Sequence, residues 1–187
     1  MTTLPTGNDY TDISCLVDYI VQITHGLHHL HTRNILHKDV AARNIIIHPH
    51  GNLQISKSGL GMYRYPNDYK HLPGVGLSPV RWLSPTCLET GVYKTATDVY
   101  MLGVLIWETF SLGSQPYGPC ENDDDVIEMI INGGKLSCPV LCPDFVWDVA
   151  VRCMATAEQE RPSVAAVREV VEARGPILQP MSDIVLT

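Results

Sequence analysis

The chain has 187 residues, of which 45% are hydrophobic and 18% are charged, and its formal net charge is −7 at pH 7. This composition is typical of one globular domain and excludes a disordered chain or a fibrous repeat. No window holds the ~20 apolar residues that a membrane-spanning helix needs, and the N-terminus lacks the pattern of a signal peptide. We therefore expect one domain over residues 12–173, preceded by an N-terminal extension (1–11) and followed by a C-terminal tail (174–187).

Positive charge is concentrated in the first half of the chain. Between Arg33 and Arg81 there are seven Lys or Arg residues and two Asp or Glu residues, a local balance of +5 that leaves −12 for the remainder. Such a segment is typical of a surface that meets phosphates or an acidic partner, although a mixed, solvated surface has the same composition. The acidic total and the lack of interleaved aromatic residues argue against nucleic acid as a partner.

The hydrophobic pattern predicts mainly helices. Apolar residues at steps of three and four indicate an amphipathic helix over residues 12–32, capped by Asp12 or Thr11. Two β-branched runs around a glycine-containing turn predict a short hairpin within residues 44–56. Residues 59–85 show no periodicity and recurrent Gly and Pro, so we expect a long surface loop there. Further helices are expected over residues 96–110, 123–132, 144–155 and 163–173.

Two groups of metal-ligand residue types do not make a convincing metal site. Only some of the histidines in the first helix can share a face, and no acidic residue lies near them in the sequence (His25, His28, His29, His31). The six cysteines lack paired spacing, and the pair Cys138 and Cys142 has no second pair at zinc-finger spacing. We expect free thiols and no bound metal.

The stretch "ILHKDVAARN", residues 35–44, places several catalytic residue types between two apolar runs. It is followed in order by "VRWLSP", "TDVYMLGVLIWETFSLGSQPYG" and "ERPS". In these motifs and their spacing the chain resembles the C-terminal lobe of a protein tyrosine kinase over residues 12–173. The resemblance implies a mainly α fold with a small β-hairpin. No GxGxxG and no evident phosphate-pairing lysine occur in these 187 residues, so we expect them not to include the N-terminal lobe.

The resemblance also implies roles for five residues. Asp39 matches the kinase carboxylate that accepts the proton of the substrate hydroxyl, and Asn44 matches the carboxamide that holds a metal ion. Arg43 matches a residue that helps to seat the substrate tyrosine. His37 and Asp98 match structural positions, and Asp98 is expected to accept backbone hydrogen bonds from the catalytic loop.

The motif that should complete the site is degraded. Lys57, Ser58 and Gly59 stand where active kinases carry Asp-Phe-Gly, whose aspartate binds the magnesium that bridges the phosphates. An ammonium there would repel the metal, since a unit charge pair ~4 Å apart is worth about 4 kcal/mol at an effective dielectric near 20. Ser58 also removes an aromatic ring that should pack near His37. No cofactor is therefore expected, and ATP and Mg²⁺ are expected only if the chain belongs to an active enzyme.

A second motif has lost its acidic residue. Thr86 stands where kinases carry a glutamate that pairs with an arginine, matched here by Arg161. We expect Arg161 to pair with Glu160 or Glu89 instead, or to be solvated.

The expected surface loop contains three tyrosines that another kinase could phosphorylate: Tyr63, Tyr65 and Tyr69. The added charge could then pair with a nearby cation, for which the candidates are Arg64, Lys70 and Arg81.

Two functions remain open at this stage. The first is a pseudokinase lobe of a tyrosine-kinase-like receptor, cytoplasmic, acting as a scaffold or docking module for signalling proteins. The pattern is most similar to the inactive receptors of the off-track and inactive tyrosine-protein kinase seven group, and next to the group related to Derailed. The alternative is a fragment of a functional tyrosine kinase. Further expected contacts are the missing N-terminal lobe in a longer product and, through a parent receptor, the membrane.

Overall fold

The computed structural model describes residues 12–56, 59–120 and 122–174. The expected N-terminal extension, Lys57, Ser58 and the tail beyond Arg174 lie outside these residues. The helices are α1 (Ile13–Thr32), α2 (Leu60–Arg64), α3 (Pro85–Thr90), α4 (Thr95–Phe110), α5 (Asp123–Ile131), α6 (Asp144–Cys153) and α7 (Val164–Arg174). The strands are β1 (Ile45–Ile47), β2 (Leu53–Ile55), β3 (Lys70–Leu72) and β4 (Gly76–Ser78), and short 3-10 helices cover Ala42–Asn44, Pro66–Asp68, Val80–Trp82 and Glu158–Glu160.

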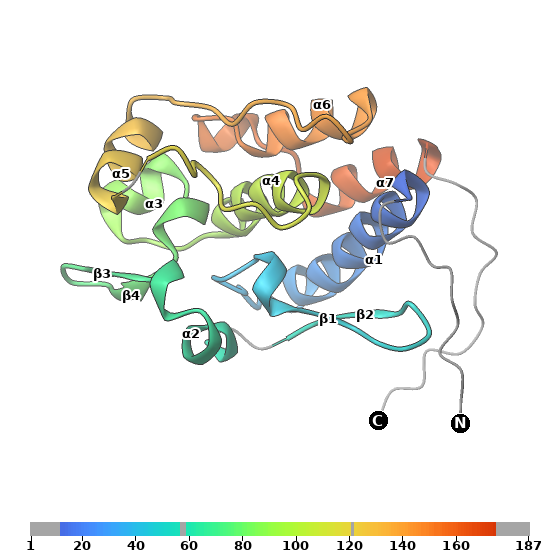
Figure 1. The fold of residues 1–187 in the computed structure, drawn as a ribbon, viewed down its shortest axis with the longest axis horizontal. Helices are drawn as coiled ribbons and strands as arrows, with labels where there is room; N and C mark the ends of the chain where they lie inside the picture. Colours follow the sequence, from blue (N-terminus) through green and yellow to red (C-terminus); the bar gives the residue numbers. More distant parts are fainter. Residues whose placement is uncertain (1–11, 57–58, 121, 175–187) are drawn as a thin grey trace.

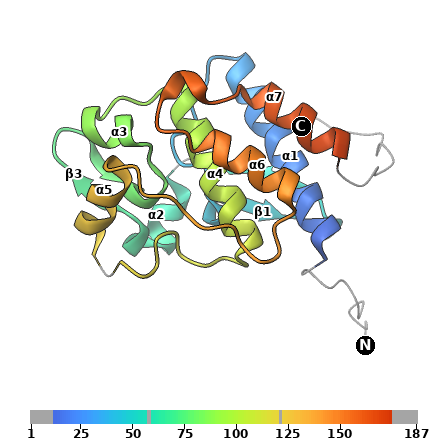
Figure 2. The same ribbon diagram turned by 90° about the horizontal axis from the view of Figure 1, so that it is seen from above.

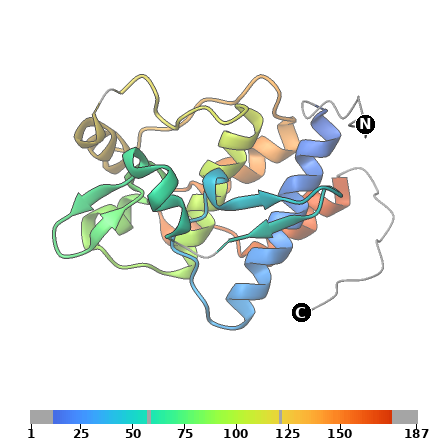
Figure 3. The ribbon, with the colours of Figure 1, turned by 60° about the horizontal axis from the view of Figure 1, so that its bottom comes forward.

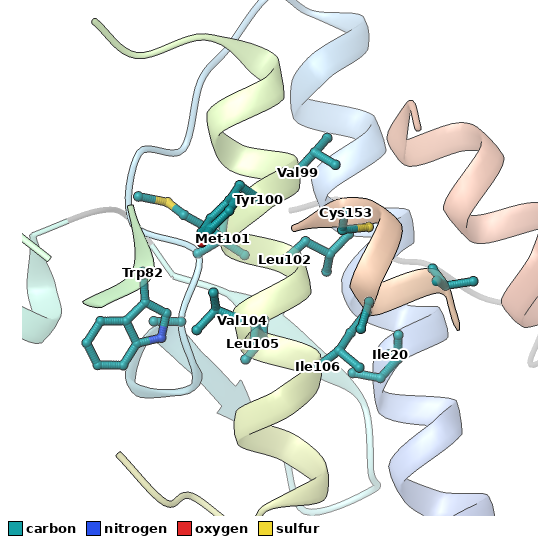
Figure 4. Close-up of a cluster of buried hydrophobic side chains, with 14 of the residues drawn as sticks. Ile20, Trp82, Val99, Tyr100, Met101, Leu102, Val104, Leu105, Ile106 and Cys153 are labelled. Carbon is teal, nitrogen blue, oxygen red and sulfur yellow. The ribbon is translucent and has the colours of Figure 1, made fainter. Parts of the chain in front are cut away.

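Helix α4 forms the centre of the fold. Its residues from Val99 to Ile106 are all buried, and Figure 4 shows their side chains directed to several sides of the helix. A helix that is apolar all round must be enclosed by other elements. Figures 1 and 2 show α6 alongside α4 and α1 on another side of it, as the contacts between these helices also indicate.

Gly103 lets α4 and α6 approach closely. A Cβ atom at this position would lie 2.7 Å from Cγ of Met154 and 2.9 Å from the backbone oxygen of Ala150. Both distances are shorter than carbon atoms tolerate. The close packing of the two helices therefore depends on the missing side chain.

Helix α1 has the amphipathic character that its spacing predicts. Asp12 caps it by accepting a hydrogen bond from the Ser14 amide at 2.9 Å, so the first of the two expected caps is confirmed. Its buried face consists of Leu16, Val17, Ile20, Ile23, Thr24 and Leu27. Helix α7 lies beside it (Figure 1) and contributes three buried valines, Val164, Val167 and Val171.

The predicted hairpin is confirmed. Strands β1 and β2 pair antiparallel, with Ile45 opposite Ile55. The hairpin lies against α1 (Figure 3), where the Gln22 side chain accepts a hydrogen bond from the Leu53 amide at 2.8 Å and donates one to the Gly51 oxygen at 3.2 Å. These two bonds fix the hairpin to the helix.

The prediction of a plain loop over residues 59–85 is wrong. The segment contains helix α2, the antiparallel pair β3 and β4, and the buried turn Val80–Trp82. Each strand has only three residues, which is too short to give an alternating pattern. The six-residue helix α3 was also not expected. It begins after Ser84, whose hydroxyl accepts a hydrogen bond from the Cys87 amide. The four later helices lie where the periodicity predicts them.

The basic segment does not form one positive surface. Arg43 and Arg81 are buried, and Arg81 pairs with Asp123 at 2.8 Å. Lys70 pairs with Asp124 at 2.6 Å. Internal contacts thus use cations that the composition alone would assign to a partner. The exposed cations of this segment among the described residues are Arg33, Lys38 and Arg64.

None of the helices within residues 12–56, 59–120 and 122–174 combines the length and hydropathy needed to cross a membrane.

Replacing Gly103 by alanine tests the close packing of α4 and α6. The new methyl group must push α6 away, so we expect Gly103→Ala to lower the free energy of unfolding by about 1–3 kcal/mol in urea denaturation. Gly26→Ala is the matched control, because that glycine is also helical but meets only the flexible Ile55 side chain, at 3.0 Å. Helix propensity favours alanine in both variants by up to about 1 kcal/mol, so the difference between them reports the steric cost at Gly103. Equal losses in both variants would contradict this account.

Candidate functional site

The buried carboxylate of Asp98 positions the catalytic loop. It lies in the first turn of α4 and accepts backbone hydrogen bonds from His37 and Lys38, both at 2.8 Å. The contact expected from the kinase resemblance is therefore present. Lys38 has a φ of 67°, in the left-handed region that non-glycine residues rarely adopt. The bond to Asp98 helps to hold the backbone there.

Asp98 also corrects one expectation about the histidines. Nε2 of His31 lies 3.0 Å from Oδ2 of Asp98, the oxygen that also accepts from the His37 amide, and His25 pairs with Glu172. The acids absent from the local sequence are supplied by α4 and α7. Within the described ranges no group of three or more His, Cys, Asp or Glu side chains is arranged to hold a metal ion.

His37 connects the catalytic loop to the end of the hairpin. Its Nε2 lies 2.7 Å from the Ser56 oxygen, and its Nδ1 lies 3.3 Å from the Asp39 amide nitrogen. A neutral ring with its proton on Nε2 satisfies both contacts, donating to Ser56 and accepting from Asp39. His37 thus ties the backbone of Asp39, the candidate proton acceptor, to the end of the hairpin at Ser56.

Both oxygens of the Asp39 carboxylate are engaged within the chain. Oδ1 accepts a hydrogen bond from Nη2 of Arg43 at 2.5 Å, and Oδ2 accepts one from the Tyr69 hydroxyl at 2.6 Å. Nε of Arg43 also donates to the Tyr69 oxygen at 2.8 Å. The three buried side chains form a closed triangle. In this arrangement the candidate proton acceptor already has a tyrosine hydroxyl as its partner.

Arg43 is held by aromatic rings as well as by charge. Its guanidinium carbon lies 4.1 Å from the centre of the Trp82 ring and 4.7 Å from that of Tyr69, and Nη1 lies 3.3 Å from the Asp68 carboxylate. Burial lowers the pKa of Arg43, but the contacts with Asp39 and Tyr69 outweigh it and raise the pKa above its usual value. Nε, Nη1 and Nη2 of the guanidinium thus all donate to side chains of the same chain.

Tyr69 is not the exposed tyrosine that a surface loop predicts. It is 9% exposed, whereas Tyr63 is 92% and Tyr65 is 47% exposed. Burial, and next the hydrogen bond to Asp39, raise the pKa of Tyr69 to about 12, so its hydroxyl remains a donor. The expectation of exposure therefore holds for Tyr63 and Tyr65 and is wrong for Tyr69. Of the cations proposed to meet an added phosphate, Arg64 is exposed, while Lys70 and Arg81 are paired with acids.

Asn44 provides one free oxygen. Its Nδ2 donates to the Asp39 backbone oxygen at 2.8 Å, while its buried Oδ1 has no hydrogen-bond partner. Gly61 lies so close that a Cβ there would be 2.9 Å from this oxygen. Mg²⁺ prefers six oxygens, usually with one or two carboxylates. One neutral oxygen beside an engaged Asp39 does not fit it. Gly59 starts α2 with a φ of 90°, next to the undescribed Lys57 and Ser58.

Glu108 is a site residue that the sequence reasoning missed. It is buried near the end of α4, where Oε2 accepts hydrogen bonds from Trp82 Nε1 at 2.7 Å and from the Ala42 amide at 3.1 Å. Burial raises the pKa of Glu108 to about 7. Together with Arg43 and Asp68 it lines a cavity of about 350 Å³. The sequence does carry a signal for it, because Glu108 directly follows the apolar run that forms the buried helix.

Arg161 finds neither Glu160 nor Glu89, so that expectation is wrong. Its guanidinium lies 5.1 Å from the centre of the Tyr100 ring, and burial lowers its pKa, partly offset by the charge of Glu158. Its nitrogens donate to three backbone oxygens at 2.8–3.1 Å, those of Ala96, Ala155 and Thr156. Backbone carbonyls from the start of α4 and from the segment after α6 thus take the place of the expected carboxylate.

Removing the Tyr69 hydroxyl tests the triangle. Tyr69→Phe leaves Oδ2 of Asp39 buried without its donor, and we expect the free energy of unfolding to fall by about 1–3 kcal/mol in urea denaturation. Tyr63→Phe removes the same atom from an exposed ring and should change stability by less than about 0.5 kcal/mol. Matching effects of the two variants would show that the triangle adds no stability.

The raised pKa of Glu108 predicts a pH dependence. Because the folded chain binds the Glu108 proton more tightly than the unfolded chain, this stability is present below about pH 4.5 and is lost as the pH rises to about 7. Glu108→Gln removes the titration. We expect the stability of the original chain relative to the variant to fall by about 3 kcal/mol between about pH 4 and pH 8, measured by denaturation. A difference independent of pH would contradict the buried, protonated carboxyl.

Comparison with known proteins identifies the family of the chain. A sequence model described as "Protein tyrosine and serine/threonine kinase" matches residues 2–171. The chain is 36% identical over 162 residues to human proto-oncogene tyrosine-protein kinase ROS, covering 84% of the chain and 7% of that protein. It is 34% identical over 183 residues to Drosophila melanogaster tyrosine-protein kinase Shark, covering 97% of the chain and 19% of that protein. The chain spans a small part of these relatives. The chain belongs to the protein tyrosine kinase domain family.

Proposed function

We propose that this chain is a pseudokinase lobe, which acts in the cytoplasm as a docking module for signalling proteins and does not transfer phosphate. The observation that carries the proposal is the triangle of Asp39, Arg43 and Tyr69. A kinase needs a carboxylate free to accept the substrate proton and an arginine free to seat the substrate ring. Here a tyrosine of the same chain occupies both groups.

The metal side of the site supports the same conclusion. Lys57 stands in the sequence where the family carries its magnesium-binding aspartate. Asn44 offers a single neutral oxygen, and the carboxylate of Asp39 has no free oxygen to add. Among the described residues these donors are fewer than the oxygens Mg²⁺ prefers, which supports a lobe that works without the metal.

The finer assignment within the family rests on motifs. "HKD" together with an altered Asp-Phe-Gly is the combination by which the chain resembles the off-track and inactive tyrosine-protein kinase seven receptors. In a parent receptor of this kind the lobe would be linked to the membrane by other segments. The exposed Tyr63 and Tyr65, with Arg64 between them, are the candidates for modification that recruits a partner.

A functional kinase fragment is the second candidate. Asp39 and Asn44 keep their kinase spacing, and Oδ1 of Asn44 is buried without a partner, as an oxygen intended for a ligand would be. In that case Tyr69 would have to leave Asp39 before a substrate could bind.

Ligand binding and phosphate transfer separate the two candidates. We expect no change in the melting temperature of the purified chain with ATP and Mg²⁺, since a ligand that does not bind the folded state does not stabilise it. We also expect no transfer of labelled phosphate to a tyrosine-containing polymer, for the chain alone or within its longer parent protein.

The control is Asp39→Asn, which removes the proton acceptor and keeps the size of the side chain. Phosphate transfer by the original protein that this variant abolishes would overturn the proposal. Transfer that is equal in both proteins would identify a contaminating kinase and leave the pseudokinase assignment in place.

A further inference from the structure

Another cavity lies away from the catalytic loop. It has a volume of about 600 Å³ and shares no lining residue with the cavity beside Arg43. Tyr100 of α4, Tyr117 of the following loop, Leu136 and Met154 line it. Four segments that are distant in sequence therefore converge on one hollow. Its volume is within the range of sites that hold small organic molecules, about 300–1,000 Å³.

The two tyrosines supply an unused hydrogen-bond donor. Both rings are buried, and their hydroxyl oxygens lie 3.5 Å apart. Among the described residues, this contact is the one hydrogen bond that either hydroxyl makes. One hydroxyl donates to the other, so the second keeps its hydrogen without an acceptor. Burial raises the pKa of both groups, which keeps them protonated. An acceptor oxygen inside the cavity would complete the pair.

The residues that line the cavity also include cations. Lys135 and Arg152 are exposed, and neither is among the ion pairs formed within the described part of the chain. Nε of Arg152 donates to the Asp148 backbone oxygen at 3.3 Å, which leaves its other nitrogens available. Glu160 also lines the cavity, so these three groups carry a net charge of +1. An acidic ligand is therefore favoured over a basic one.

We propose that this cavity binds a small aromatic carboxylate that carries a second acceptor oxygen on its ring. The ring packs between Leu136 and Met154, the ring oxygen accepts from the tyrosine pair, and the carboxylate meets Lys135 and Arg152. This inference goes beyond the proposed scaffold function and does not depend on it, because Asp39 and Arg43 take no part.

Three probes of similar shape test the chemistry in the full chain by calorimetry. Chromone-2-carboxylate has both features, its carboxamide lacks the charge, and naphthalene-2-carboxylate lacks the ring oxygens. We expect chromone-2-carboxylate to bind with a dissociation constant below about 1 mM, and each of the other two probes to bind about fivefold to tenfold more weakly.

Variants of the lining residues test which side chains cause the preference for the carboxylate and the preference for the ring oxygens. The double variant Lys135→Ala and Arg152→Ala should abolish the preference for carboxylate over carboxamide. The double variant Arg33→Ala and Lys38→Ala, which removes two exposed cations elsewhere, should not.

Tyr117→Phe should abolish the preference for the chromone over the naphthalene, with circular dichroism used to verify that the variant is folded. Failure of all three probes to bind at about 1 mM would overturn the proposal. So would chromone binding that neither the cation pair nor Tyr117→Phe affects.

Discussion

The buried carboxylate of Asp98 is the interaction on which the site depends. A charge that is fully removed from water must be paired and hydrogen-bonded, and Asp98 meets this requirement with two amides of the catalytic loop and the His31 ring. The same bonds hold Lys38 in its left-handed conformation. The charge therefore fixes the path of the chain into Asp39, and the positions of the neighbouring side chains follow from that path.

A second buried acidic side chain, ten residues later in α4, holds the other end of the loop. Glu108 accepts from the Ala42 amide and from the Trp82 ring, and Trp82 in turn packs against the Arg43 guanidinium. The central helix thus positions the loop at two points. With both points fixed, Arg43 and Asp39 face the segment that carries Tyr69. These contacts hold the loop in place, while the carboxylate of Asp39, the candidate proton acceptor, is engaged by its own chain.

Sequence patterns predicted the long elements well. The first helix and four later helices bury enough apolar residues to show a periodicity, and the first hairpin has two β-branched runs around a turn. The same reasoning failed over residues 59–85, where strands of three residues leave no measurable period. It also failed for Arg81, which the charge count placed on a surface, either positive or mixed and solvated. In the fold it donates to Asp123 and to backbone oxygens around Pro116.

The sequence by itself determined the family resemblance, the order of the kinase motifs, and the presence of Lys57 where the resemblance places a metal-binding aspartate. These are properties of residue type and spacing along the chain. Only the tertiary structure decided the partners: Tyr69 for Asp39, and backbone carbonyls for Arg161. Hydrogen bonds and ion pairs act over about 3 Å in space, whereas these groups lie up to 65 residues apart in the chain. The pattern of residue types along the chain does not contain these distances in space, so the contact between Tyr69 and Asp39 could be found only in the folded structure.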